Sequence, residues 1–182
     1  MSKKSVKSGP LTTVTDKMLS SRVNFARNLA ALRQSFGLSY NQLGEAIEGT
    51  GAALSDIEKD RTTTTLDRFE RLCRVFGLGP SEFIQKKVQV PKITKKVAVK
   101  KGNKFVYNSN LCHNIETAIK ALGVSFIDVA DSAGVSPSTV WRIQTSQDVN
   151  VSLPIVERLA ISMGVPFESL ITKKLSKKDF LN

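Results

Sequence analysis

The sequence has little of what catalytic and metal sites need. It contains one histidine, His113, and two cysteines, Cys73 and Cys112. It has no glycine-rich phosphate loop, no metal-ligand spacing and no paired nucleophile and base. We therefore expect no enzyme activity, no cofactor and no metal site. His113 is interpreted as a surface residue, and the two cysteines as buried structural thiols in a reducing compartment.

Long hydrophobic runs are also missing. No stretch of about 18 apolar residues occurs, which excludes a membrane-spanning helix. The first ten residues, MSKKSVKSGP, lack the apolar segment of a signal peptide. The sequence therefore predicts a cytoplasmic, nucleoid-associated protein with no membrane partner. Hydrophobic residues still make up 41% of the 182 residues, which is enough for a core.

Acidic residues are absent from one central segment. Lysines and arginines number 27 against 16 acids, and residues 85–109 hold eight lysines and no acid. The apolar-rich segments 20–84 and 110–171 carry net charges of 0 and −3. Concentrated basic charge favours a polyanion partner, most often nucleic acid, through neutralisation of phosphates and release of counterions. Solubilising linkers are the alternative interpretation of these lysines.

Two stretches of the chain repeat one pattern. Residues 29–58 align with residues 115–144 at a constant offset of 86, and residues 66–84 align with residues 153–171 at an offset of 87. The later pair shares the tripeptide Glu-Arg-Leu. Each copy is typical of five short helices, so the repeat predicts two similar helical units.

Capping residues mark the second and third helices of each copy. The expected N-caps are Ser39, Thr50, Ser125 and Ser136. The glycines expected to end the first and second helices, because glycine accepts a positive φ, are Gly37, Gly49, Gly123 and Gly134. Two helices joined by such a short turn form a helix-turn-helix, whose later helix enters the major groove of DNA.

The predicted architecture is all-α. Two tandem five-helix helix-turn-helix domains span residues 20–85 and 110–172, and basic tails span residues 1–19 and 173–182. The Lys-rich segment 86–109 joins the domains. Its valines and isoleucines alternate with lysines around Lys-Lys-Gly-Asn, so both a β-hairpin and an extended tether stay open.

The third helices of the two copies have different outward faces. At about 100° per residue, Ser138, Trp141 and Arg142 lie opposite the apolar Val140 and Ile143, and we expect them to contact bases. Arg142 can form two hydrogen bonds to guanine. Burial of Trp141 and pairing of Arg142 with a surface carboxylate are the alternatives. The candidate base contacts in the first copy are Ala52, Ser55 and Lys59.

Both copies resemble the lambda-repressor/Cro-like helix-turn-helix family, often called XRE. The resemblance is carried by LSYNQLGEAIEGTGAALSDIEKD (38–60) with LDRFERLCRVFGL (66–78), and by VSFIDVADSAGVSPSTVWRI (124–143) with LPIVERLAISMGV (153–165). It implies a DNA-binding transcription regulator of phage, plasmid or bacterial type. It also implies phosphate contacts from the start of the second helix and from the loop after the third.

The phosphate contacts implied in this way are Ser39, Tyr40, Asn41, Arg61, Thr62, Ser125, Thr145, Ser146 and Gln147. The family often has glutamine at the positions of Tyr40 and Phe126, and Phe126 cannot donate to phosphate. The charge of the central segment adds Lys95, Lys96, Lys100 and Lys101 as phosphate contacts.

Three functions remain open at this point. The first is a sequence-specific regulator of double-stranded DNA, expected to be a repressor, acting as one two-headed chain or as a homodimer. The second is a protein-interaction module of antitoxin or antirepressor type, in which domain 1 dimerises or binds a partner protein. The third is an architectural protein that binds nucleic acid without base preference.

Overall fold

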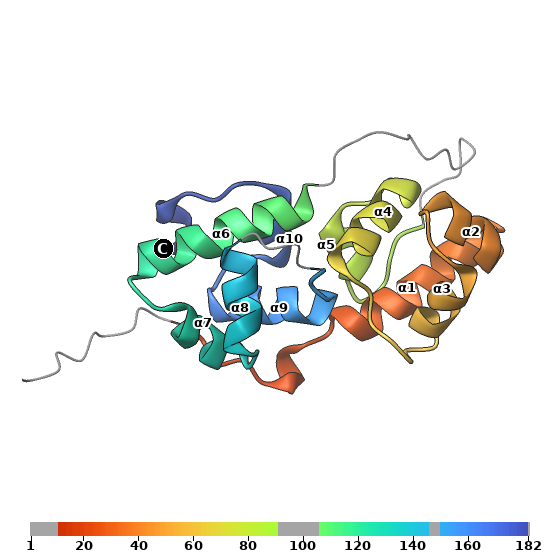
Figure 1. The fold of residues 1–182 in the computed structure, drawn as a ribbon. Coiled ribbons are helices and arrows are strands. Elements are labelled where there is room, and N and C mark those ends of the chain that lie inside the picture. The colour runs from red at the N-terminus through yellow and green to blue at the C-terminus, as the bar shows by residue number, and fades with distance from the viewer. Residues whose placement is uncertain (1–10, 91–105, 146–149, 182) are drawn as a thin grey trace, which may run out of the picture.

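The computed structural model describes residues 11–90, 106–145 and 150–181. Within these residues the chain is all-α, as predicted, and forms no strand (Figure 1). The first helix set is α1 (Ser21–Ser35), α2 (Tyr40–Ala46), α3 (Gly51–Glu58), α4 (Leu66–Phe76) and α5 (Pro80–Ile84). The second helix set is α6 (Tyr107–Leu122), α7 (Phe126–Ala133), α8 (Pro137–Gln144), α9 (Leu153–Ser162) and α10 (Phe167–Thr172).

The predicted N-caps begin the helices as expected. Ser39 accepts a hydrogen bond from the backbone N of Gln42 at 3.1 Å, and Ser125 accepts one from that of Asp128 at 3.2 Å. Thr50 and Ser136 cap α3 and α8 in the same way. Both helix-turn-helix units therefore start where the sequence places them.

One predicted helix end was wrong. Gly49 was expected to take the left-handed conformation after α2, but Glu48 takes it, with φ 53°. The equivalent residue at the offset of 86 is Gly134, with φ 64°. The alignment of the copies, rather than the nearest glycine, thus locates this turn. The side chain of Glu48 pairs with Arg71, which holds the turn from outside.

Gly44 lets α2 and α3 pack closely. A Cβ atom at Gly44 would lie 2.8 Å from the backbone N of Gly51 and 2.9 Å from the carbonyl carbon of Thr50. Real side chains do not tolerate such distances, so a larger residue here would separate the two helices. The equivalent Ala130 is fully buried between α7 and its neighbours.

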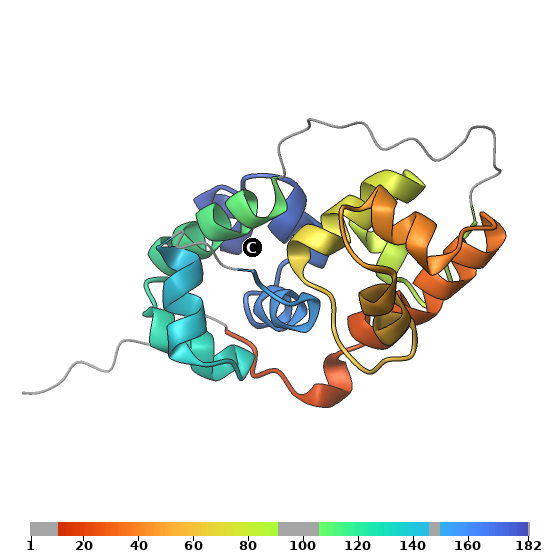
Figure 2. The same cartoon turned by 45° about the vertical axis from the view of Figure 1, so that its right-hand side comes forward.

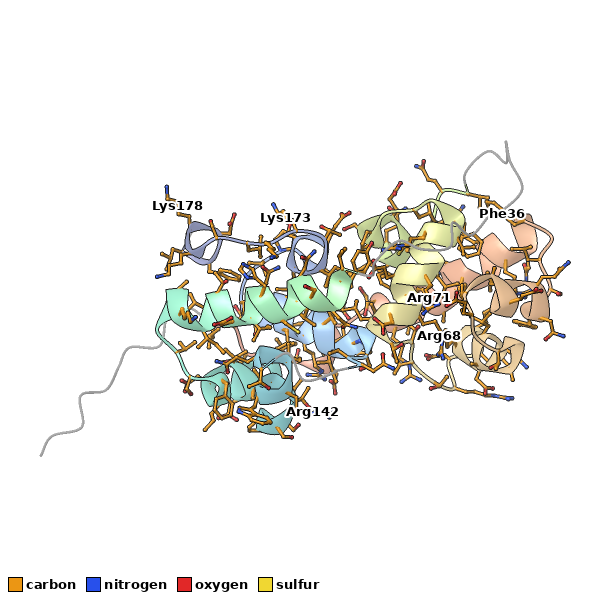
Figure 3. The ribbon with its side chains drawn as sticks, turned by 45° about the horizontal axis from the view of Figure 1, so that its top comes forward. Phe36, Arg68, Arg71, Arg142, Lys173 and Lys178 are labelled. Atoms are coloured by element: carbon orange, nitrogen blue, oxygen red, sulfur yellow. The ribbon has the colours of Figure 1, made fainter. Side chains whose placement is uncertain are left out.

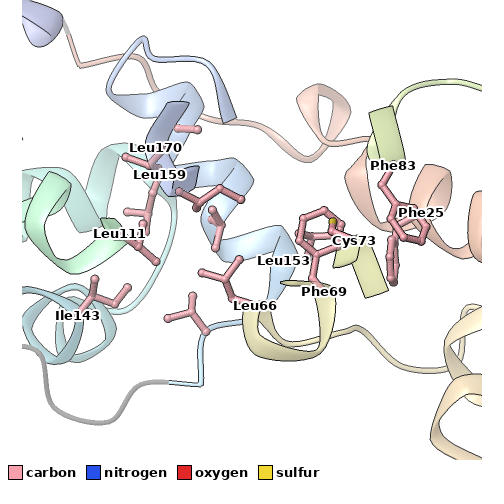
Figure 4. Close-up of a cluster of buried hydrophobic side chains, with 14 of the residues drawn as sticks. Phe25, Leu66, Phe69, Cys73, Phe83, Leu111, Ile143, Leu153, Leu159 and Leu170 are labelled. Carbon is pink, nitrogen blue, oxygen red and sulfur yellow. The ribbon is translucent and has the colours of Figure 1, made fainter. Parts of the chain in front are cut away.

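One hydrophobic core runs through both helix sets. Phe25, Phe69 and Phe83 pack together in the first set, with ring centroids 4.9–5.9 Å apart. Leu66 and Leu153, both fully buried, lie between this aromatic cluster and the leucines of the second set (Figure 4). The two sets are therefore packed against each other rather than connected only by the chain.

The segments beyond the helix sets also pack on the second set. The backbone N of Thr12 donates to the carbonyl of Ser162, and that of Val14 donates to the carbonyl of Ser132, both at 2.8 Å. Figure 2 shows this N-terminal segment running from the second set to α1. At the other end, Phe180 in a short 3-10 helix (Lys177–Phe180) is buried near α6. The division into domains and basic tails stays a prediction.

Two buried acids link the helix sets. Glu157 on α9 accepts hydrogen bonds from the backbone N atoms of Ser20 and Ser21 at the start of α1, at 3.0 and 3.1 Å. Glu70 on α4 accepts from the backbone N atoms of Val106 and Tyr107 at the start of α6, at 3.1 and 2.9 Å. Each set thus caps the first helix of the other. Figure 2 shows α9 and the start of α4 at the centre of the molecule.

Candidate nucleic-acid interface

Helix α8 presents a polar and aromatic face to solvent. Ser138, Trp141 and Arg142 are exposed, with 43% exposure for Trp141, while Val140 and Ile143 are buried. The guanidinium of Arg142 has no hydrogen bond or ion pair with the residues that the structure describes. Its donors are therefore available to a ligand. Figure 3 places Arg142 at one edge of the molecule, opposite Lys173 and Lys178.

Helix α3 has a different outward face. The residue equivalent to Arg142 is Asp56, and the residue equivalent to Trp141 is Ser55. Asp56 lies 3.6 Å from Arg61, a predicted phosphate contact, so each offsets the charge of the other. Of the predicted base contacts here, Ala52 and Lys59 are exposed and Ser55 is half-buried.

A half-buried ion pair stabilises α3 on the side that faces α1. Arg33 on α1 donates to both carboxylate oxygens of Glu58, at 2.7 and 2.9 Å. The Tyr40 hydroxyl donates to the same carboxylate at 2.9 Å, and the Arg33 guanidinium lies 4.0 Å from the centre of the Tyr40 ring. The hydrogen bond to Glu58 raises the pKa of Arg33. The hydroxyl hydrogen of Tyr40 is thus already donated within the molecule.

The N-termini of α2 and α7 carry different capping residues. The backbone N of Ser39 donates to the neutral side chain of Gln42 at 2.8 Å. The backbone N and hydroxyl of Ser125 both donate to the carboxylate of Asp128 at 2.7 Å. These two hydrogen bonds lower the pKa of Asp128, which keeps it charged. Because helix N-termini attract phosphate, the start of α2 suits a phosphate better than the start of α7.

The other predicted phosphate contacts are only partly described. Asn41 and Thr62 are exposed near α3. Thr145 is exposed after α8, and its hydroxyl donates to the carbonyl of Trp141 at 3.0 Å. The predicted contacts that lie outside the described residues are Ser146, Gln147, Lys95, Lys96, Lys100 and Lys101. Residues 91–105, for which a β-hairpin and an extended tether both stay open, also lie outside them.

Reactive side chains do not gather in the part of the chain that the structure describes. Cys73 is buried, and burial raises the pKa of its thiol. His113 and Cys112 are half-buried on α6. Among the described residues no group of three or more His, Cys, Asp or Glu could hold a metal ion. No helix there is long and apolar enough to cross a membrane.

The structure also reveals paired residues that the sequence did not single out. Asn28 on α1 donates to the carbonyls of Phe83 and Gln85, both at 2.8 Å. Its equivalent on α6, Asn114, donates to the carbonyls of Leu170 and Lys173, also at 2.8 Å. Both asparagines hold the end of the fifth helix of their set and the first residue after it. The sequence does show that a polar residue recurs at both positions of the repeat, and this recurrence could have marked the two asparagines. The same holds for the glutamates of the repeated Glu-Arg-Leu.

Comparison with known proteins agrees with this geometry. Residues 24–83, which cover most of α1–α5, match a family model described as a helix-turn-helix domain. The chain is 35% identical over 57 residues to the HTH-type transcriptional regulator PuuR of Escherichia coli (strain K12). The protein of the same name from Shigella flexneri matches equally well. Residues 24–83 are therefore similar to helix-turn-helix domains of the XRE-like type.

The matches to the PuuR proteins cover only part of each chain. The aligned residues cover 31% of this chain and 31% of the length of each PuuR protein. No solved structure matches the chain. The family match ends at residue 83, so the relation of α6–α10 to the XRE-like fold rests on the internal repeat and on the equivalent helices.

Proposed function

We propose that the protein is a sequence-specific regulator of transcription, acting as a repressor, that inserts α8 into the major groove of double-stranded DNA. The XRE-like domain and the partial similarity to a transcriptional regulator support DNA binding. The second helix-turn-helix unit supports base recognition, because its third helix has the side chains that reach into a groove.

The exposed, unpaired Arg142 carries this proposal. It lies beside the exposed Trp141 on α8, with Ser138 one turn earlier. An arginine can form two hydrogen bonds with the O6 and N7 atoms of guanine, and an apolar ring can contact the methyl group of thymine. Arg142 therefore selects a guanine, while Trp141 contacts a neighbouring base or sugar.

The first helix-turn-helix unit contributes mainly contacts to the DNA backbone. Ser39 and Asn41 at the start of α2 meet a phosphate, together with Lys59 and Thr62 at and after the end of α3. Short side chains such as Ala52 leave little direct base readout to α3. The lysines of the central segment add affinity that falls as salt concentration rises.

The test is selection of bound sequences from a random duplex pool at about physiological salt, where non-specific binding weakens. The proposal expects an enriched motif whose most restricted position is a guanine. With Arg142→Ala, the restriction at that one position should disappear. Binding of all duplexes with equal affinity would contradict base recognition and leave an architectural role.

A protein-binding role is the second candidate for the first helix set. The observation that favours it is the neutral outer surface of α3, where Asp56 pairs with Arg61 and Ala52 is exposed. Such a surface attracts phosphate weakly and suits dimerisation or a protein ligand of antirepressor or antitoxin type. Sedimentation of the 19.9 kDa chain tests dimerisation through this surface, since a self-associating surface gives a concentration-dependent mass that exposed charges introduced at Ala52 should abolish.

A further inference from the structure

The contacts between the helix sets follow the internal repeat. Glu70 and Glu157 are equivalent at the offset of 87, and the helix starts that they cap, residues 106–107 and 20–21, are equivalent at the offset of 86. The contact that Glu70 of the first set makes with the second set is thus matched by the contact that Glu157 of the second set makes with the first. This reciprocity is the signature of an approximate twofold axis between the halves.

The backbone repeats the same reciprocity. Thr65 and Ser152 form an isolated antiparallel bridge. The backbone N of Leu66 donates to the carbonyl of Val151 at 2.7 Å, and the backbone N of Leu153 donates to the carbonyl of Thr64 at 3.0 Å. Both pairs are equivalent at the offset of 87. The two halves therefore meet through the same residues, as the subunits of a symmetric dimer do.

This junction resists independent movement of the halves. Glu70 and Glu157 are 1% and 8% exposed, and Leu66 and Leu153 are fully buried. Separating the halves would expose the leucines and leave the backbone donors at two helix starts without their carboxylate acceptors. The equivalent helices α3 and α8 lie in opposite halves on either side of this junction (Figure 1).

We infer that one chain is a preassembled two-headed DNA reader. The junction of Glu70, Glu157 and the Thr65–Ser152 bridge holds α3 and α8 in one fixed relation. A single chain then recognises a bipartite duplex site with one spacing and two unlike halves. Recognition of that site rests on the proposed function, whereas the fixed relation of the two helices is a property of the free protein.

The fixed relation is tested first without DNA. Spin labels are attached at the equivalent exposed positions through Ala52→Cys and Ser138→Cys in a Cys112→Ser background, where Cys73 is buried. Electron–electron distance measurements on the free chain should give one narrow distribution. Adding Glu70→Gln and Glu157→Gln should broaden it, because an amide replaces each charged acceptor. Circular dichroism establishes that the variant stays helical.

The matched control is Glu116→Gln, which removes an exposed carboxylate on α6 that pairs only with Lys120 in the described structure. This change should leave the distribution narrow. A broad distribution in the unmodified chain would overturn the inference, because the halves would then move independently. A distribution that stays narrow in the double variant would overturn the role of the two carboxylates.

The DNA part is tested on the selected duplex, shortened stepwise from the end that the first helix set contacts. A fixed reader should keep its affinity until the duplex no longer reaches the phosphates at α2 and α3, and should then lose about tenfold at one defined length. A gradual loss without a defined length would overturn it. Failure to select any sequence would refute the proposed function and leave the distance measurement on the free chain standing.

Discussion

The two helix sets share one backbone plan and differ in the residues that face a ligand. Arg142 on α8 corresponds to Asp56 on α3, so a free cation in one set is replaced by a paired anion in the other. The capping residue at the start of the second helix differs in the opposite sense, with Asp128 in α7 and the neutral Gln42 in α2. Under the proposed function, the second set distinguishes bases and the first set holds phosphate.

This comparison shows how a duplicated fold can divide a task. In a homodimer every subunit must carry both base and phosphate contacts, since its surface is the same. In one chain with two copies, each copy can lose what the other supplies, provided that their relative position is fixed. The reciprocal contacts of Glu70 and Glu157 meet that condition.

Replacing Arg142 by aspartate, the residue at the equivalent position of the first set, should have the largest effect on DNA affinity. Arg142→Asp removes the base contact, worth about 1–3 kcal/mol, and adds an anion near phosphates, so affinity for the selected duplex should fall by more than that. Fluorescence anisotropy titrations measure the loss. With Arg142→Ala as the intermediate variant, a loss equal to that of Arg142→Asp would show that charge repulsion contributes nothing.

Removing either buried glutamate of the junction should lower the stability of the protein by a similar amount. Glu157→Ala removes the acceptor for two backbone N–H groups and for the Ser21 hydroxyl. Because unsatisfied buried donors are costly, the free energy of unfolding of this variant should fall by about 1–3 kcal/mol. Glu70→Ala should behave similarly. Urea unfolding measures the free energy. The exposed Glu116→Ala should leave the free energy of unfolding nearly unchanged, and a loss equal to that of Glu157→Ala would contradict the structural importance of Glu70 and Glu157.

Removing the anion of α3 should make the first set a better DNA ligand. Asp56→Asn frees Arg61 for phosphate and removes a repulsive charge, so affinity should rise by up to about 1 kcal/mol, the interaction of two charges at 4 Å in water. Salt titration of binding measures the change, with a steeper dependence expected. An unchanged salt dependence would show that Asp56 and Arg61 lie away from the DNA.

The smallest change is expected at the start of α7. Asp128→Asn keeps an oxygen to accept from Ser125 but removes a charge at a helix N-terminus that faces phosphate, so affinity should rise by about 0.3–1 kcal/mol. Asp179→Asn is the matched control, because Asp179 accepts from the backbone N and hydroxyl of Ser176 in the same geometry, both at 2.7 Å. A similar rise with Asp179→Asn would mean that net charge alone decides.

The local structure could be predicted from the sequence because it depends on neighbouring residues. The caps Ser39, Thr50, Ser125 and Ser136 begin helices as expected. The end of α2 was misplaced by one residue, since tertiary contacts hold Glu48 in a conformation that glycine usually takes.

The junction between the helix sets could not be predicted in this way. Glu70 and Glu157 resemble ordinary helix-surface acids in sequence, and their acceptor role depends on helix starts that lie 36 and 136 residues away. The hydrogen-bond partners of the candidate site residues likewise depend on how the helices pack. Tyr40 was expected at a phosphate, and its hydroxyl donates to Glu58 because α1 and α3 place Arg33 and Glu58 beside it.

The most direct test of the unequal halves is a complete set of single-base substitutions across the selected duplex, with the affinity of the unmodified chain measured for each. Costs of about 1–3 kcal/mol per mismatch should concentrate in the half-site contacted by α8, with small costs in the half-site of α3. Equal costs in both half-sites would contradict the division of base and phosphate contacts between the two helix sets.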